Sequence, residues 1–158
     1  MSNNNYEELI KKNHLSKEEI KEILPQREPF LMIDEVIDIN LEERKITAKR
    51  FIDNQEWYFK GHFPENPVLP GVLMIESMAQ TASILGNLLY KKNNADEIIV
   101  LAAVDDARFF GIVKPSKNIL IEAKIEKIRN PIFKAQCIVN VDGEKVAQAT
   151  ITGFSKKI

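Results

Sequence analysis

Along the last third of the chain, apolar and polar residues alternate with a period of two, which is typical of strands with one buried face. Two alternating runs flank a turn at Asn130-Pro131, and Asp142-Gly143 predicts a type I′ hairpin turn before a return strand over 146–154. Together with an apolar run over 98–104, these segments predict an antiparallel meander. The apolar residues of the two runs are Ile119, Ile121, Ala123 and Ile125, followed by Phe133, Ala135, Cys137, Val139 and Val141.

The first part of the chain is predicted to contain a helix and two strands. Ser16 followed by Glu19 forms a capping box, which starts a helix that Pro25 ends. Apolar and β-branched residues predict strands over 30–39 and 45–52. We expect a polar helical extension over 1–19 and a single domain over 20–158.

The segment 71–90 departs from the β pattern and is predicted to form a helix about 30 Å long. It contains no proline, and Pro70-Gly71 opens it. Two of the three stripes along its surface are apolar, which is wider than the apolar face of an ordinary surface helix. We therefore predict an α+β fold in which an antiparallel sheet wraps around one long central helix. The third stripe carries Glu76, Gln80, Ser83 and Asn87.

Composition narrows the chemistry that this domain can perform. The chain has 158 residues, and its 22 Lys+Arg and 23 Asp+Glu leave a net charge of -1, without the basic field that nucleic-acid or membrane binding needs. A single Cys137 excludes an internal disulfide and a zinc knuckle. Residues 1–13 lack the apolar core of a signal peptide, and the longest apolar run, 98–104, is too short to span a membrane. We expect a cytoplasmic protein that uses no metal and no cofactor.

The connection over 57–71 is the first candidate for a functional segment. It holds four of the twelve aromatic residues and three of the seven prolines. Proline restricts its own backbone and that of its neighbour, so this connection is stiff enough to hold one side chain, His62, in position. A catalytic role and a purely structural role for His62 both remain open. The other histidine, His14, lies in the polar N-terminal stretch and is expected to be a solvated surface residue.

Two positions that follow His62 complete a candidate site. Gly71 begins the predicted helix, where a backbone N–H with no side chain beside it can polarise a substrate carbonyl. Glu76 needs a partner or a shifted pKa if the helix is enclosed, but neither if the polar stripe is a solvated face. His62, Gly71 and Glu76 can thus supply a base, an oxyanion donor and an acid. Phosphate loops, dinucleotide loops and a nucleophile elbow are absent, Asp105-Asp106 is interpreted as a loop end, and Cys137 as a core residue.

These residues belong to a motif that resembles the signature of FabZ-type 3-hydroxyacyl-[acyl-carrier-protein] dehydratases, which have the hot-dog fold. The resemblance runs from about Ile20 to Phe154, and Gln26 departs from it because the family often carries His there. We expect this departure to affect only local N-terminal contacts. The matching motifs are Gly61-His62-Phe63-Pro64-x-x-Pro67-x-x-Pro70-Gly71-Val72-Leu73-x-x-Glu76-x-Met78-Ala79-Gln80, Leu24-Pro25-x-Arg27-x-Pro29-Phe30-Leu31 and Asp105-x-Ala107-Arg108-Phe109.

The resemblance implies a role for each matching residue. His62 and Glu76 correspond to the catalytic pair of the family, Gly71 to the glycine whose N–H binds the thioester carbonyl, and Gln80 to the residue that orients the carboxylate. Relatives that also isomerise the double bond typically carry Asp in place of Glu76, so Glu76 favours plain dehydration. Phe59, Phe63 and Phe109 are candidates for lining an acyl tunnel, and their interpretation as ordinary core residues remains equally open.

The resemblance also implies partners. The substrate is a 3-hydroxyacyl chain carried by acyl carrier protein, and family members are dimers, often trimers of dimers, whose sites pair His62 of one subunit with Glu76 of the other. Because carrier proteins of this type are acidic, we expect a basic docking patch. The alternatives are a dehydratase that also isomerises, a hot-dog thioesterase and a non-catalytic acyl-binding module. The candidates for the docking patch are Arg108, Lys114, Lys117 and Arg129.

Overall fold

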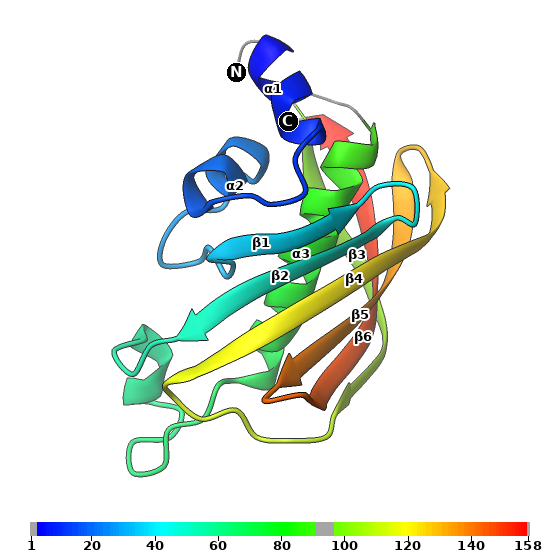
Figure 1. Cartoon of the computed structure of the whole chain (residues 1–158). Helices are drawn as coiled ribbons and strands as arrows, with labels where there is room; N and C mark the ends of the chain where they lie inside the picture. The colour runs from blue at the N-terminus through cyan, green and yellow to red at the C-terminus, as the bar shows by residue number, and fades with distance from the viewer. Residues whose placement is uncertain (1–2, 91–96, 158) are drawn as a thin grey trace.

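Six strands form one antiparallel sheet that curls around a single long helix (Figure 1). This architecture comes from a computed structural model that describes residues 3–90 and 97–157. The predicted α+β fold, with a sheet wrapped around one central helix, is confirmed. Its elements are α1 (Asn3–Ile10), α2 (Lys17–Ile23), β1 (Glu35–Asn40), β2 (Lys45–Ile52), the 3₁₀ turn η1 (Trp57–Lys60), α3 (Gly71–Tyr90), β3 (Glu97–Phe109), β4 (Lys117–Arg129), β5 (Ile132–Val141) and β6 (Glu144–Lys157).

Strands β4, β5 and β6 form the meander that the alternating pattern predicts, within a sheet of order β1-β2-β4-β5-β6-β3. Ala123 of β4 lies opposite Cys137 of β5, and both are buried on the inner face. Between β5 and β6, Asp142 and Gly143 have φ values of 51° and 84°, as a type I′ turn requires. The period-two pattern therefore identified the buried faces of β4 and β5 correctly.

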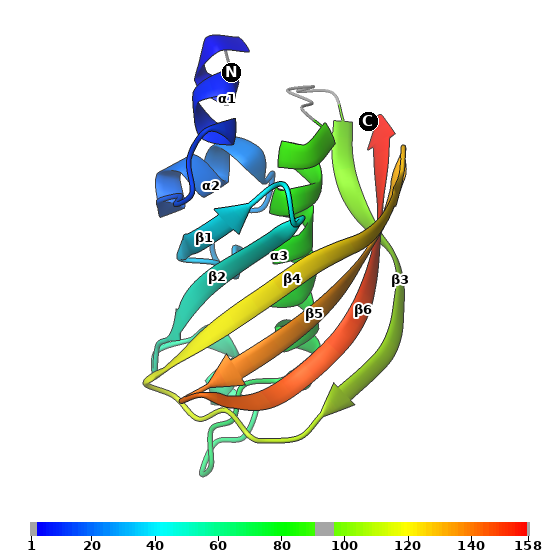
Figure 2. The ribbon, with the colours of Figure 1, turned by 45° about the vertical axis from the view of Figure 1, so that its right-hand side comes forward.

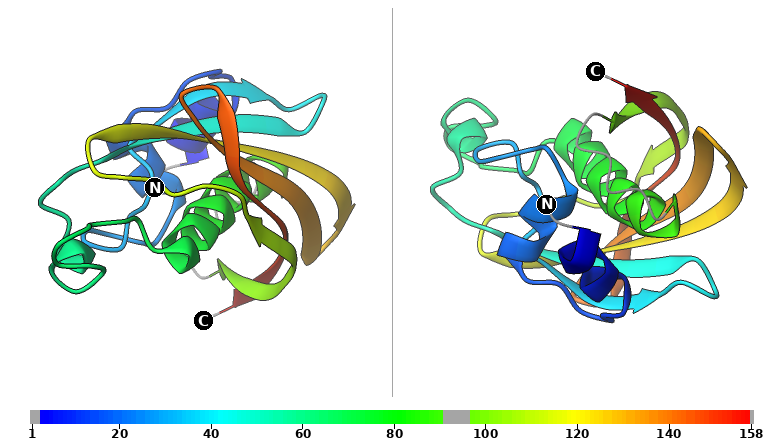
Figure 3. Two further views of the ribbon diagram at one scale, coloured as in Figure 1. Left: turned by 90° about the horizontal axis from the view of Figure 1, so that it is seen from below. Right: turned by 90° about the horizontal axis from the view of Figure 1, so that it is seen from above.

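Helix α3 occupies the predicted residues 71–90 and lies on the concave side of the sheet, as the end-on views show (Figure 3). At Gly86 and Gly153 an added Cβ would lie 2.7 and 2.3 Å from the ring of Phe133, so these two glycines allow that ring to pack between helix and sheet. By length and composition α3 is apolar enough to span a membrane, with a mean hydropathy of 1.3. However, 67% of that window is buried inside the fold, as expected of a core helix.

Two strands differ from their predicted bounds. Strand β1 begins at Glu35 rather than at residue 30, because the backbone of Phe30 and Met32 is hydrogen-bonded to the side chain of Gln80 in α3 instead of to a neighbouring strand. Strand β3 continues past the predicted 98–104 to Phe109, so Asp105-Asp106 is not a loop end. These two acidic residues lie at an irregularity in the pairing of β3 with β6, where Asp106 has a φ of 51°.

The N-terminal helices pack against the rest of the fold. The Ser16–Glu19 capping box of α2 is present, and α2 ends before Pro25 as predicted. Leu15 pairs with Val36 beside β1, and both Leu15 and Ile20 are fully buried. The expected boundary at 19/20 therefore falls inside α2, whose apolar residues join the main core.

One end of the molecule gathers four segments that are far apart in the sequence. The N-terminus of α3, the connection 53–70, the loop 110–116 and the start of β4 meet there (Figure 1). Two backbone hydrogen bonds hold them together, from the Leu69 N–H to the Val113 carbonyl (2.8 Å) and from the Ser116 N–H to the Ile52 carbonyl (2.7 Å). This end carries Gly71 and the segment with His62.

Candidate active site

The segment that carries His62 is a short loop fixed at both ends. The 3₁₀ turn η1 precedes it, and the N–H groups of Gly61 and His62 both donate to the Tyr58 carbonyl, at 3.1 and 2.9 Å. The Val68 N–H then donates back to the His62 carbonyl at 3.1 Å, which closes the loop. The predicted stiffness of this connection thus comes from backbone hydrogen bonds as well as from its prolines.

The hydrogen bonds of His62 define which ring nitrogen is available for chemistry. Its Nδ1 lies 2.9 Å from the Val68 carbonyl oxygen, which can only accept a hydrogen bond, so Nδ1 carries the proton. In the neutral ring Nε2 is therefore the unprotonated nitrogen, the form that a general base needs. Phe63 stacks on the imidazole with ring centroids 4.2 Å apart and an interplanar angle of 26°.

Glu76 lies in the second turn of α3, where Gln80 holds its carboxylate. The Gln80 Nε2 donates to Glu76 Oε1 at 2.8 Å and to the Phe30 carbonyl at 2.8 Å, while Gln80 Oε1 accepts from the Met32 N–H at 2.8 Å. Gln80 is 1% exposed, so the orientation of its amide is set by these partners. Burial raises the pKa of Glu76, and the Gln80 hydrogen bond lowers it by a smaller amount. The polar stripe of α3 is therefore not a solvated face at Glu76 and Gln80.

A pocket of about 230 Å³ lies between Glu76 and the inner face of β3 and β6. Gln26 also lines it, and its buried Oε1 has no hydrogen-bond partner among the residues that the structure describes. The departure from the family pattern at Gln26 thus lies beside Glu76 and not only among N-terminal contacts, because the bend after Pro25 returns the chain to α3. The pocket is lined by Pro25, Gln26, Glu76, Ala79, Gln80, Ser83, Ile98, Ile99, Val100, Leu101, Ile151 and Gly153.

Gly71 begins α3 beside an aromatic ring. An added Cβ at Gly71 would lie 3.0 Å from Cε1 of Phe109, so the absence of a side chain lets this ring approach the N-terminus of the helix. The first N–H groups of a helix have no intrahelical acceptor, and the helix dipole adds a partial positive charge there. The oxyanion-donor role of Gly71 stays a prediction.

The three aromatic residues proposed to line an acyl tunnel lie in different surroundings. Phe59 is a core residue at 7% exposure, whereas Phe63 and Phe109 are about half exposed. None of the three lines the pocket at Glu76 in the described chain. His62 does not line this pocket either, as far as the structure describes its lining.

The four basic residues proposed for docking do not form one patch. Lys117 and Arg129 are the two ends of the 13-residue strand β4, which separates them by about 40 Å. Lys117 is paired with Asp142 at 2.6 Å. Arg108 and Lys114 are exposed near the end of the molecule that carries Gly71, whereas Arg129 lies at the opposite end.

Some residues of the site were not identified from the sequence. The backbone groups of Phe30, Met32 and Val68 orient Gln80 and His62, and a backbone atom leaves no signal in residue type. Groups of three or more His, Cys, Asp or Glu that could hold a metal do not occur in the described part of the chain. Cys137 is a core residue as predicted, and burial raises the pKa of its thiol to about 12.

The raised pKa of Glu76 predicts how the site affects stability. The folded protein binds the proton of the Glu76 carboxyl group more tightly than the unfolded chain does. The free energy of unfolding therefore falls as the pH rises from the pKa of Glu76 in the unfolded chain through its higher pKa in the folded protein. Glu76→Gln removes the buried charge, and we expect it to raise the Tm at pH 8 by about 1–4 °C but to change it little at pH 4. Calorimetry at the two pH values tests this, with Glu65→Gln on the exposed loop as control. Equal shifts at both pH values would contradict it.

The sequence matches the FabA-like domain family over residues 24–150. Two curated relatives, from Oceanobacillus iheyensis and Bacillus cytotoxicus, are both named 3-hydroxyacyl-[acyl-carrier-protein] dehydratase FabZ. The first is 43% identical over 135 residues, which cover 85% of this chain and 94% of the relative. The second is 38% identical over 138 residues, which cover 87% of this chain and 94% of the relative.

Solved structures with similar folds include both dehydratases and thioesterases. The dehydratase heterocomplex ApeI:P from Xenorhabdus doucetiae has a TM-score of 0.70 at 15% identity, covering 87% of this chain and 91% of that chain. A mutant thioesterase from Pseudomonas aeruginosa has a TM-score of 0.61 at 15% identity, covering 80% and 82%. At this identity the similarity shows the fold alone, and the predicted hot-dog fold is confirmed.

Proposed function

Because this chain belongs to the FabA-like domain family, we propose that it is a 3-hydroxyacyl-[acyl-carrier-protein] dehydratase of fatty acid biosynthesis. Such a hydro-lyase removes water across the C2–C3 bond of a 3-hydroxyacyl thioester and leaves a trans-2-enoyl thioester. The observation that carries this function is 43% identity to a FabZ dehydratase along 94% of that relative's length. Structural similarity does not decide it, because thioesterases share the fold.

We propose that His62 and Glu76 move the two protons of the reaction. His62 Nε2 removes the proton from C2, while the Gly71 N–H and the dipole of α3 stabilise the negative charge that develops on the thioester oxygen. Glu76, protonated, transfers its proton to the C3 hydroxyl, which leaves as water as the C2–C3 double bond forms. Two observations support these roles: the Val68 carbonyl holds the proton of His62 on Nδ1, and burial raises the pKa of Glu76. In an alternative mechanism one residue makes both transfers through a bound water.

The substrate-binding roles of the aromatic residues are likewise proposals. Phe63 stacks on His62, and Phe109 lies against the N-terminus of α3. Both rings are half exposed and stand beside the groups that would contact the thioester, so we propose that they flank it. The acyl chain would extend along the pocket at Glu76, whose β3 and β6 residues are mostly apolar.

We propose that each site is shared by two subunits of a homodimer. In the described sheet β3 is one of the two edge strands and pairs with β6 on one side only (Figure 2). A long exposed edge strand invites pairing with another chain. Its apolar side chains add to this, with Leu101 and Phe109 at 49% and 47% exposure. A second subunit would supply the His62 that the pocket at Glu76 lacks, and assembly into a hexamer stays a prediction.

Acyl carrier protein is the proposed macromolecular partner. We propose that it docks at the end of the molecule that carries Gly71, because Arg108 and Lys114 are exposed there and their charge suits an acidic partner. Lys117 lies at the same end but is already paired with Asp142. Arg129 lies about 40 Å away along β4 and is too far to join them. A cytoplasmic location stays a prediction.

Incubation of the protein with 3-hydroxyacyl thioesters of several chain lengths tests the proposed function. We expect ultraviolet absorbance of the enoyl thioester to rise without release of free thiol, with the double bond at C2. Stoichiometric thiol release would identify a thioesterase instead. A double bond at C3 would indicate an additional isomerase activity, and a lack of turnover at every chain length would favour a non-catalytic acyl-binding module.

A further inference from the structure

Arg50 is a buried cation that the reaction proposed above does not use. Its side chain points inward from β2 and is 4% exposed, although most arginines lie at the surface. One terminal nitrogen lies 2.5 Å from Glu56 Oε1, and the other contacts Met32 Sδ. A buried guanidinium is costly to desolvate, so this position calls for an explanation beyond packing.

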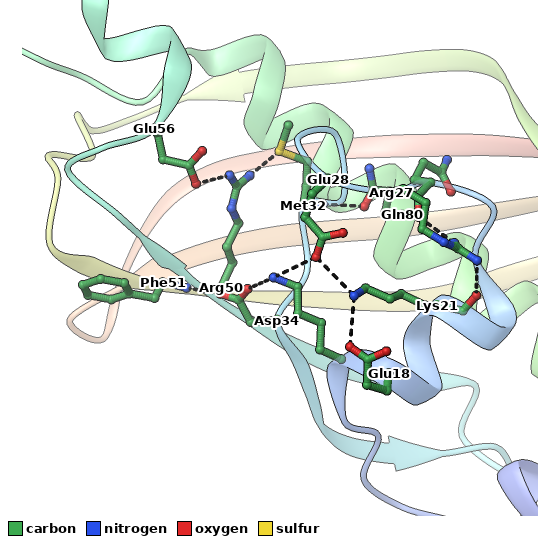
Figure 4. Close-up of polar contacts among 12 residues, drawn as sticks. Glu18, Lys21, Arg27, Glu28, Met32, Asp34, Arg50, Phe51, Glu56 and Gln80 are labelled. Atoms are coloured by element: carbon green, nitrogen blue, oxygen red, sulfur yellow. Dashed lines mark hydrogen bonds and ion pairs between the residues drawn. The ribbon is translucent and has the colours of Figure 1, made fainter.

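The two groups that Arg50 contacts lead to the two proposed catalytic residues. On one side is Met32, fully buried, whose backbone N–H donates to Gln80 Oε1 and thereby orients the amide that holds Glu76. On the other side is Glu56, the residue before η1, from which the chain continues to His62. Figure 4 shows the guanidinium between Glu56 and Met32, with Gln80 beyond Met32.

We propose that Arg50 is a positioning residue for the dehydration. Its guanidinium links Met32, whose backbone orients Gln80 against Glu76, to Glu56, which stands at the start of the segment that carries His62. This inference rests on the proposed function. It extends that function by one residue that contacts neither the proposed substrate nor the reacting atoms.

The contacts explain why a cation with two donor nitrogens suits this position. Glu56 needs an ionic partner because its side chain is only 18% exposed. The guanidinium fork can satisfy that carboxylate and still lie against Met32 with its second terminal nitrogen. Removing the guanidinium would free residues 30–32 to shift relative to α3. The Gln80 amide would then lose the fixed positions of its acceptor, the Phe30 carbonyl, and its donor, the Met32 N–H.

The expected consequence is a defect in turnover rather than in substrate binding. Misplacing a proton-transfer group by about 1 Å can cost around 100-fold in rate, so we expect Arg50→Met to lower kcat by about 10- to 100-fold. We expect KM for the thioester to change by less than about threefold, since Arg50 does not line the pocket. The neighbouring Lys49→Met is the matched control, because the Lys49 side chain is 37% exposed and forms an ion pair with Glu35 of β1 instead of pointing into the core.

A double variant separates positioning from the burial of charge. In Arg50→Met/Glu56→Gln neither charge is left unpaired, so the stability lost in Arg50→Met should largely return. We expect kcat to stay low, because the contact with Met32 is still missing. The double variant also keeps the test valid if Arg50→Met alone fails to fold.

Titration of the Glu76 carboxyl by ¹³C NMR supplies a readout that does not depend on turnover. The Gln80 hydrogen bond lowers the pKa of Glu76, so loosening Gln80 should raise it. The residues that share the pocket with Glu76 are uncharged as far as the structure describes it, and the double variant removes one positive and one negative charge together. A rise that persists in the double variant therefore reports the hydrogen bond.

Each outcome of these measurements either supports or overturns the proposed role of Arg50. A low kcat and a raised Glu76 pKa in the double variant support the proposal. Recovery of both stability and kcat in the double variant would overturn it, as would an Arg50→Met protein with kcat within threefold of the parent and an unchanged Glu76 pKa. A parent protein without dehydratase turnover refutes the proposed function alone, because the titration still tests whether Arg50 positions Glu76.

Discussion

Replacement of His62 or Glu76 by alanine is expected to abolish nearly all dehydration, with kcat lower by about 10²–10⁴-fold, because each change removes a positioned proton-transfer group. The two groups act on different atoms of the substrate, the C2 proton and the C3 hydroxyl. The other described histidine, His14, is exposed and lies beside Glu35 at the N-terminal side of the fold. Among the residues described as lining its pocket, Glu76 is the one with a carboxyl group. Single-turnover formation of the enoyl thioester measures the loss.

The fold should survive both substitutions. His62 lies on a surface loop that the backbone hydrogen bonds of Tyr58 and Val68 still hold. At Glu76 the substitution removes a carboxyl group that is costly to ionise where it is buried. His14→Ala and Glu65→Ala are matched controls, since each removes the same side-chain type from an exposed position, and both should retain full activity. Activity of His62→Ala or Glu76→Ala within tenfold of the parent would contradict the proposed mechanism.

Mixing the two inactive variants is expected to restore activity to about a quarter of the parent value. Random exchange between equal amounts of His62→Ala and Glu76→Ala subunits gives about half heterodimers, and each heterodimer has one intact site of two. The physical basis is that His62 is absent from the described lining of the pocket at Glu76, while the exposed edge of β3 offers a surface for a second chain. Turnover after mild dissociation and reassociation measures the recovery.

A doubly substituted chain provides the control for this experiment. When His62→Ala/Glu76→Ala is mixed with either single variant, no combination of subunits contains an intact pair, so activity should not recover. Subunit exchange itself can be followed with tagged chains and mass spectrometry. If exchange is complete and the two single variants still recover nothing, both residues act within one subunit and the shared site is wrong.

Local sequence patterns predicted the regular elements well. The bounds of β2 and α3 were predicted correctly at 45–52 and 71–90, and the buried faces of β4 and β5 followed from the alternation of their apolar residues. These features are local, because each residue's neighbours along the chain already define the period or the turn. The hairpin at Asp142-Gly143 is the clearest case, since its turn type depends on two adjacent residues.

Predictions failed where a distant segment replaced a local partner. Residues 30–34 have strand-like composition, yet the side chain of Gln80, 48 residues after Met32, bonds the Phe30 carbonyl and the Met32 N–H in place of a neighbouring strand. Similarly, the basic residues after Val104 looked like one patch, but the length of β4 separates Lys117 from Arg129. Sequence proximity does not predict spatial proximity when a long strand lies between.

The sequence by itself thus determined the class of fold, the long central helix and the motif that contains His62, Gly71, Glu76 and Gln80, because residue type and spacing express all of these. Only the tertiary structure decided that Glu76 is partly buried in a pocket with Gln26, that Nδ1 of His62 carries the proton, and that Arg50 lies between the backbone beside Gln80 and the start of the His62 segment. The physical reason is that burial, tautomer and ion pairing depend on which distant backbone groups approach a side chain, and those approaches exist only once the sheet has closed around α3.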